Sequence, residues 1–169
     1  RLGQLNYRNT NWYAGTKVQR IDIIDPYISA SDLNRPYDRL PELMLGNEYN
    51  LGGFQIGVDA NHVRFDRSLD VTQLSAAQLD NGALVTGNRA HIEPHISYPI
   101  RGNAGFIVPT VKYKYTAWSL DQQALGTQDN PDRGVGVFSL DTGLVFEREM
   151  NLGNGFIQTL EPRLYYLYS

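Results

Sequence analysis

The sequence predicts an all-β fold, in which about eight antiparallel strands form a segment of a transmembrane β-barrel. Apolar and polar residues alternate along five well-defined segments, and short turn-forming links alternate with long polar links down the chain. Apolar runs fall well short of the ~20 residues that a membrane-spanning helix needs. The composition agrees, because 11 Tyr, 16 Gly and 11% aromatic residues suit strands and turns better than a helical bundle.

The clearest strand signal lies in residues 54–66. Phe54, Ile56 and Val58 alternate with polar or small residues, and Asp59 and Asn61 fall on the opposite phase. A period of two is typical of a strand with one apolar and one polar face. The same alternation is clear over residues 89–100, 107–115, 138–147 and 159–168. It is weaker over residues 2–7, 12–24 and 42–49.

The links between these segments change regularly in length. Tight hairpin turns rich in Asn and Gly are predicted at residues 9–11, 50–53, 101–104 and 151–155. Longer polar links are predicted at residues 25–41, 67–88 and 121–134. Because transmembrane barrels have short periplasmic turns and longer extracellular loops, we expect the long links to lie outside the cell.

Each strand is expected to turn its polar residues toward the barrel lumen and its apolar residues toward lipid. The predicted lumen-facing residues carry mixed charge and are Asp59, Asn61, His91, Glu93, His95, Lys112, Lys114, Asp141, Glu147, Glu161 and Arg163. The predicted lipid-facing residues are Phe54, Ile56, Val58, Ile92, Ile96, Val111, Leu140, Leu144 and Leu164. Aromatic residues near the strand ends suit the interfacial girdles of a barrel, namely Tyr98, Tyr115, Trp118, Phe138, Phe146 and Tyr168.

A soluble β-sandwich is the alternative at this level, since its apolar faces would form a core and its polar faces would meet water. Alternation alone does not separate the two folds, but the regular change between short and long links favours the barrel. A net charge of −3 with scattered Lys and Arg argues against a nucleic-acid partner. The lack of Cys excludes disulfides, thiolate zinc sites and cysteine nucleophiles from this sequence.

His91, Glu93 and His95 share one face of a predicted strand, and imidazole and carboxylate groups are suitable zinc ligands. They would be spread over ~13 Å at ~3.3 Å per residue, too far apart to converge on one ion without a bulge. We therefore favour a polar row that lines the lumen, and expect no metal and no cofactor. A hydrolase could use one of these histidines as base and Ser97 as nucleophile, but the sequence around Ser97 has no nucleophile elbow. We therefore do not expect the protein to be an enzyme.

Residues 92–98 and 160–166 echo each other in register, with Glu93 and Glu161 on the inner phase and Pro94 and Pro162 on the outer one. Proline has no N–H to donate to a strand ladder. We therefore expect Pro94, Pro109 and Pro162 each to weaken pairing locally or to mark a bulge. We favour the interpretation that these prolines are simply tolerated at bulges over the alternative that they make the barrel wall deformable.

Four phrases of the sequence are specific enough to compare with known families. They are PYDRLPEL at residues 36–43, HIEP at 91–94, FSLDTGLVFER at 138–148 and TLEPRLYYLY at 159–168. They are spread between residues 36 and 168 and resemble the LptD (Imp/OstA) family of lipopolysaccharide-assembly proteins. The resemblance implies that residues 1–169 are a middle part of the C-terminal transmembrane barrel domain, and that the family's periplasmic jelly-roll domain lies outside this chain.

In that family the barrel encloses a lipoprotein plug of the LptE type. It receives lipopolysaccharide from a periplasmic bridge protein through the N-terminal domain and inserts it into the outer leaflet. The resemblance therefore implies a wall segment in the cell outer membrane of a Gram-negative bacterium, with lipopolysaccharide, plug, bridge protein and outer-membrane lipid as partners and no covalent chemistry. The family's lateral gate lies between the first and last strands, and by our placement these strands are neither.

A self-contained eight-stranded barrel, acting as an anchor, a pore or a lipid-modifying enzyme, is the alternative function, because eight strands suffice for closure. The chain starts at Arg1 without a signal peptide and stops inside the strand-like run of residues 164–168. With the family phrases, these ends lead us to expect a slice of a larger barrel.

Overall fold

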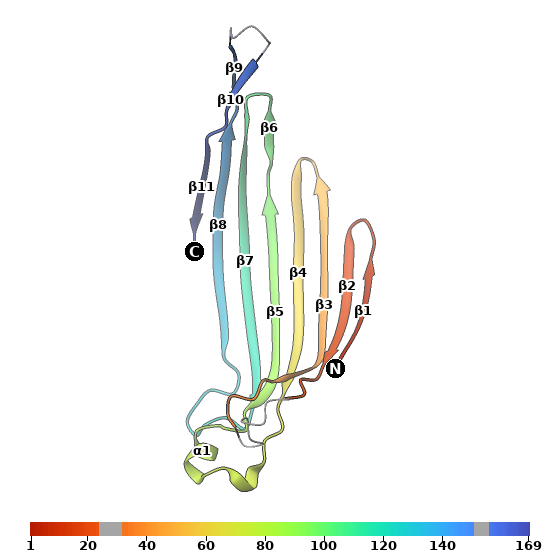
Figure 1. Ribbon diagram of the computed structural model, residues 1–169, viewed down its shortest axis with the longest axis vertical. Coiled ribbons are helices and arrows are strands. Elements are labelled where there is room, and N and C mark those ends of the chain that lie inside the picture. Colours follow the sequence, from red (N-terminus) through yellow and green to blue (C-terminus); the bar gives the residue numbers. More distant parts are fainter. Residues whose placement is uncertain (24–31, 151–155) are drawn as a thin grey trace.

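The chain forms one broad antiparallel sheet with its long connections gathered at one end, as the computed structural model in Figure 1 shows. The structure describes residues 1–23, 32–150 and 156–169. This part of the chain contains eleven strands and only two short helical turns, which confirms the predicted all-β class. Within it, no helix is both long enough and apolar enough to cross a membrane.

The strands of the main sheet follow one another in chain order. They are β1 (Leu2–Arg8), β2 (Trp12–Gln19), β3 (Asp38–Leu51), β4 (Phe54–Asp66), β5 (Thr86–Ser97), β6 (Ile100–Gly102), β7 (Gly105–Asp121), β8 (Asp132–Leu144) and β11 (Arg163–Tyr168). β6 pairs with β7 and continues the position of β5, so eight strands lie side by side from β1 to β11, as predicted. Among the described residues no pairing joins β1 to β11, and the sheet is therefore open.

The remaining strands, β9 (Phe146–Met150) and β10 (Phe156–Leu160), pair only with each other among the described residues. They form a separate hairpin beyond the short-turn end of β8 (Figure 1). The predicted strands over residues 138–147 and 159–168 are thus each divided in two. The second division falls at Glu161 and Pro162, where proline cannot donate to the ladder.

Three of the four predicted hairpin turns are confirmed. β3 and β4 are joined by Gly52 and Gly53, whose φ angles of +59° and +89° are the left-handed values that a tight two-residue hairpin requires. The Asn9 carboxamide oxygen accepts hydrogen bonds from the backbone N–H groups of Asn11 (3.0 Å) and Trp12 (2.8 Å) in the β1–β2 turn. Asn103 and Ala104 join β6 to β7, whereas the predicted turn at 151–155 lies outside the described residues.

The boundaries of three strands differ markedly from prediction. The strand expected over residues 12–24 ends at Gln19, because its register against β3 shifts after Lys17 and the Ile21 N–H donates to the Asp38 carboxylate (2.8 Å). β3 begins at Asp38 instead of residue 42. β7 also extends beyond the predicted 107–115, since its ends pair with β5 and β8.

The prolines affect pairing at two of the three predicted places. The ladder between β5 and β7 is interrupted at Glu93 and Pro94 and resumes in the same register at His95. Pro162 separates β10 from β11. Pro109 instead keeps a partner, Leu140 in β8, and its carbonyl accepts the Tyr98 N–H (3.1 Å).

The long links lie together at the end of the sheet opposite the short turns (Figure 1). The β4–β5 link holds η1 (Val71–Gln73) and α1 (Ala76–Asp80), which begin at the capping residues Asp70 and Ser75. The side chain and backbone of Thr72 donate to the Asp70 carboxylate, and these hydrogen bonds hold the pKa of Asp70 below its usual value. The small core also lies here, with Val63 1% and Ala83 6% exposed.

Candidate functional site

Strand pairing sorts the predicted side chains into two faces, because residues opposite each other in an antiparallel ladder point to the same side. Asp59 is opposite Glu93, and Asn61 is opposite His91. The structure thus brings together on one side, called the polar face below, Asp59, Asn61, His91, Glu93, His95, Lys112, Lys114, Asp141 and Arg163. The other side, called the apolar face, carries Phe54, Ile56, Val58, Ile92, Ile96, Val111, Leu140, Leu144 and Leu164.

The apolar face is open over most of its area. Ile92 is 43%, Val111 53% and Leu164 63% exposed. A soluble sandwich would bury such positions beneath a second sheet. In the part of the chain that the structure describes, no second layer covers this face, so the sandwich alternative is wrong. Contiguous exposed apolar surface of this kind indicates contact with a partner or with lipid.

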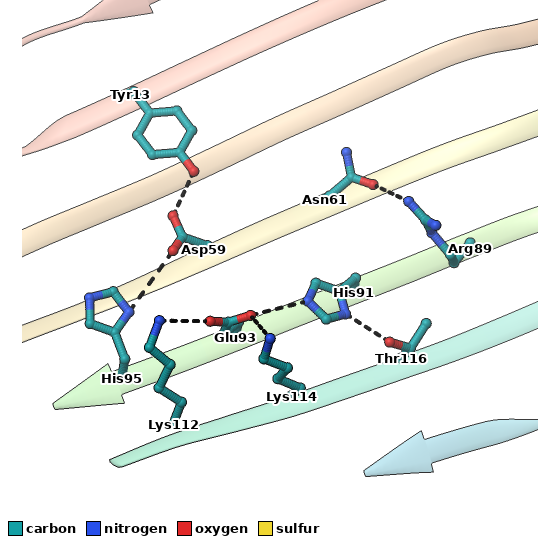
Figure 2. A network of polar contacts seen from close by, with 10 residues as sticks. All are labelled: Tyr13, Asp59, Asn61, Arg89, His91, Glu93, His95, Lys112, Lys114 and Thr116. Atoms are coloured by element: carbon teal, nitrogen blue, oxygen red, sulfur yellow. Dashed lines mark hydrogen bonds and ion pairs between the residues drawn. The ribbon is translucent and has the colours of Figure 1, made fainter. Parts of the chain in front are cut away.

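Glu93 is the centre of the polar face (Figure 2). Its carboxylate lies 3.2 Å from Lys112 Nζ, 3.4 Å from Lys114 Nζ and 3.8 Å from His91 Nε2. The second ring nitrogen of His91, Nδ1, is hydrogen-bonded to Thr116 Oγ1 at 2.7 Å. The Glu93 side chain is only 17% exposed, so these bases surround a largely shielded carboxylate. Each ionic hydrogen bond of this kind is stronger than its neutral counterpart.

Asp59 is held from two sides. The Tyr13 hydroxyl donates to Asp59 Oδ1 at 2.6 Å, and His95 Nδ1 lies 3.9 Å from Oδ2 (Figure 2). Glycines opposite the two rings make this possible. Gly46 is opposite Tyr13 and Gly57 is opposite His95, so each ring lies over a strand position without a side chain.

Substituting Gly57 by alanine is therefore expected to displace His95 and to lower the free energy of unfolding by about 1–3 kcal/mol. A Cβ atom there would lie 2.5 Å from the Asn47 carbonyl oxygen and 2.6 Å from His95 Nε2. Thermal unfolding of the full-length protein in detergent measures the effect. Gly136→Ala is the matched control, because a Cβ at Gly136 meets nothing within 4 Å. Equal stability of the two variants would contradict the steric argument.

A second polar cluster surrounds Glu42, which is buried. Arg39 Nη1 lies 3.4 Å and Lys17 Nζ 4.0 Å from its carboxylate. Asn61 Nδ2 donates to Glu42 Oε1 (3.3 Å), and Arg89 donates to Asn61 Oδ1 (3.1 Å). The cluster links β2 to β5 across the polar face.

The edge of the polar face next to β11 holds a separate charged pair. The Arg163 guanidinium donates to both Asp141 oxygens, from Nε at 2.8 Å and from Nη2 at 2.5 Å. This is the bidentate geometry that arginine forms with a carboxylate. The charge of Arg163 is therefore matched within the sheet.

Some predicted positions fall elsewhere. Glu147 belongs to β9 in the separate hairpin, and Glu161 lies in the break between β10 and β11, so the structure does not bring either onto the polar face. Trp118 is three residues from Tyr115, and this odd spacing places it on the polar face beside Lys114. The girdle prediction is wrong for Trp118, because neighbouring strand positions alternate between faces.

The histidines do not converge. His91 contacts Glu93, His95 approaches Asp59, and the Ser97 hydroxyl donates to Gln55 Oε1 (3.2 Å). Among the described residues, no group of three His, Asp or Glu side chains is placed to hold a metal ion.

The apolar face carries an aromatic row at its short-turn end. Trp12 Nε1 donates to the Tyr49 hydroxyl at 2.6 Å, and the two rings meet edge to face with centroids 6.4 Å apart. The Phe54 and Tyr98 rings lie 4.6 Å apart. Aromatic side chains at this level are typical of a barrel's interfacial girdle.

Arg67 joins two of the long links. It donates to the Leu33 carbonyl (2.6 Å) in the β2–β3 link and to the Ala83 carbonyl (2.7 Å) in the β4–β5 link. Its guanidinium lies 4.5 Å from the centre of the Tyr37 ring, and the Tyr37 hydroxyl donates to the Val85 carbonyl (2.9 Å). We call Arg67, Tyr37 and their carbonyl partners the loop clamp.

The loop clamp lies at the end of the polar face. Tyr37 packs edge to face on Phe65, and Arg89 lies 5.7 Å from the centre of the Phe65 ring. Val63, which shares the phase of Phe65 on β4, is almost fully buried. The clamped links therefore cover the polar face where the sheet ends.

Both a family model and individual known proteins are similar to this chain. The family model described as LPS transport system D matches residues 1–169. The LPS-assembly protein LptD of Pseudomonas aeruginosa is 35% identical over 189 residues, covering 97% of this chain and 20% of that protein. The LPS-assembly protein LptD of Burkholderia ambifaria is 35% identical over 170 residues, covering 98% of this chain and 19% of that protein. The chain thus spans about a fifth of the length of these curated relatives.

Proposed function

Because the chain belongs to the LptD family, we propose that it is a wall segment of a barrel that assembles lipopolysaccharide into the outer leaflet of a Gram-negative outer membrane. The polar face lines the lumen, the apolar face contacts lipid, and the long links lie outside the cell. The observation that carries the proposal is a single-layer sheet with a networked, mixed-charge face and an open apolar face. The proposed role involves no covalent chemistry.

The charges of the polar face suit a lining. Lys112 and Lys114 share the carboxylate of Glu93, and Arg163 pairs with Asp141, so each of these cations has an acidic partner within the wall. Such a surface can form many weak polar contacts with a saccharide that moves along it or with a plug. It does not offer a tight binding site for anions. We propose lipopolysaccharide and an LptE-type lipoprotein plug as the partners of this face, and a periplasmic bridge protein as the partner of the N-terminal domain.

The open sheet supports a slice of a larger barrel over a self-contained one. In lipid, the unpaired N–H and C=O groups of an edge strand each cost several kcal/mol, so a membrane sheet must close or continue. β1 and β11 lie at opposite sides of the sheet (Figure 1). We therefore place residues 1–169 within the C-terminal barrel domain of a longer protein, in which further strands pair with both edges.

Cysteine labelling of the full-length protein in membranes tests the two faces. A lipid-soluble thiol reagent is expected to modify cysteines at Ile92, Ile96 and Leu144. A water-soluble reagent is expected to modify cysteines at His91, His95 and Asp141. The reverse pattern would show that the faces are exchanged.

Depletion tests the transport role directly. When synthesis of the full-length protein is stopped, newly made lipopolysaccharide is expected to disappear from the cell surface, as measured by surface labelling after a metabolic pulse. Undiminished arrival of lipopolysaccharide at the surface would contradict the proposed function.

A further inference from the structure

The apolar face contains a hollow of about 490 Å³ that the lining role does not use. It spans β3, β4, β5 and β7 and is lined chiefly by Leu43, Leu45, Ala60, Ala90, Ile92 and Tyr115. Ala60 and Ala90 leave room there, because each side chain is only a methyl group. Ala60 lies between Leu45 of β3 and Ile92 of β5, and Ala90 lies between His62 of β4 and Ala117 of β7. Its volume lies within the range of ligand sites, roughly 300–1,000 Å³.

Nitrogen-containing side chains lie at one end of the hollow. His62 forms part of its wall, and Arg64 lies two residues further along β4 toward the long links, on the same phase. Both are exposed, and neither forms an ion pair with an acidic side chain within the described residues. The next residue on that phase, Asp66, accepts a hydrogen bond from the Arg67 N–H (2.9 Å).

An unmatched arginine on an apolar face needs a polar partner. A lipid-facing arginine is costly at the bilayer midplane but costs little near the interface, where lipid headgroups lie. Its planar fork matches the oxygens of a phosphate. An apolar hollow with Arg64 beyond its rim therefore combines a place for an acyl chain with a place for the phosphate of the same lipid.

We propose that this hollow binds a lipopolysaccharide molecule from the membrane side, with one acyl chain against Ala60 and Ala90 and a lipid A phosphate against Arg64. The proposal rests on the proposed function, which turns the apolar face toward lipid and places the Arg64 end in the outer leaflet. The bound lipid is one that has already been delivered to that leaflet, and it fills the hollow on the membrane side of the sheet.

Photocrosslinking in the full-length protein tests the site. A photoreactive amino acid replaces Leu45 at the edge of the hollow or, in a second protein, Ile96, which lies on the same face outside it. After irradiation of outer membranes, adducts are separated and stained for lipopolysaccharide and for phospholipid. Position 45 is expected to yield mainly lipopolysaccharide adducts.

Two substitutions should reduce these adducts. Arg64→Gln is expected to lower the yield at position 45 about tenfold, the loss expected for a charge-assisted hydrogen bond. Ala60→Leu, which fills the hollow, is expected to act similarly, and Arg64→Lys to retain part of the yield. The controls Arg101→Gln, at the short-turn end, and Val111→Leu, elsewhere on the face, should leave it unchanged. Because Arg64 is exposed and Ala60 faces lipid, these variants should assemble normally, as checked by heat-modified mobility.

The outcomes separate the site from the proposed function. If lipid adducts form at both positions and their yield is unchanged by Arg64→Gln and Ala60→Leu, the proposed site is wrong, but the apolar face still contacts lipid. Mainly phospholipid adducts at position 45 would overturn lipopolysaccharide as the occupant. No lipid adducts at either position would overturn the assignment of the apolar face itself.

Discussion

Replacing Glu93 by glutamine is expected to lower the free energy of unfolding of the full-length protein by about 1–3 kcal/mol. The substitution leaves Lys112, Lys114 and His91 beside one another without the carboxylate that they share. Because Glu93 is only 17% exposed, water compensates only partly for the lost charge. The backbone pairing of β5 with β7 is also interrupted at this residue. The side-chain contacts of Glu93 therefore contribute more to holding β5 and β7 together there. Urea unfolding in detergent measures the change.

Three further variants separate the charge network from general damage to the strand. Glu93→Asp keeps the charge on a shorter side chain and should lose less stability. Adding Lys112→Gln to Glu93→Gln should restore part of the loss, since one of the facing cations is removed. Glu48→Gln, an exposed glutamate near the short-turn end of β3, should have little effect. If Glu93→Gln and Glu48→Gln were equally stable, Glu93 would not be the centre of the polar face.

Most of the strands, and the eight side-by-side positions of the main sheet, could be predicted because the signal is local. A period of two is visible within a single segment such as residues 54–66, and glycine pairs such as Gly52 and Gly53 mark a turn by their own conformational freedom. The phase of each strand also follows from its own sequence. Ile92, Glu93 and Pro94 therefore fall on the expected sides of β5 without knowledge of its neighbours.

The partners of the polar side chains could not be predicted, because they depend on register between strands. Tyr13 reaches Asp59 across β3 only because Gly46 lies opposite its ring. β2 lacks clean alternation, so no pattern marked Tyr13 as part of the polar face. The sequence places Glu42 in a strand but does not predict its burial. Glu42 contacts Arg39 and Lys17, which are brought to it where the register of β3 shifts against its neighbours.

The loop clamp escaped prediction for a different reason. It joins residues 34 and 16 positions apart in sequence, Arg67 with Leu33 and with Ala83, through backbone carbonyls that no residue type identifies. Composition alone predicted the links as polar loops. Their packing on the end of the polar face is a tertiary effect, visible in the burial of Val63 and Ala83.

Replacing Arg67 by alanine is expected to open the two long links while leaving the sheet folded. The change removes two short hydrogen bonds to the Leu33 and Ala83 carbonyls and the contact with the Tyr37 ring. Hydrogen bonds to a charged group contribute roughly 1.5–3 kcal/mol each, and local opening of a loop follows the local free energy. External protease on intact cells should therefore cleave the β4–β5 link at least about tenfold faster.

The control variants test whether Arg67 acts through its fork of donors. Arg67→Lys keeps the charge but can reach fewer carbonyls, and its cleavage rate should be intermediate. Arg133→Ala, at the start of β8, removes an exposed arginine from the same end of the sheet and should change nothing. Because the clamp covers the end of the polar face, Arg67→Ala should also let a water-soluble thiol reagent reach a cysteine at Asn61 faster from outside the cell. Faster proteolysis without faster labelling would show that the links are tied together by Arg67 but do not restrict access to the polar face.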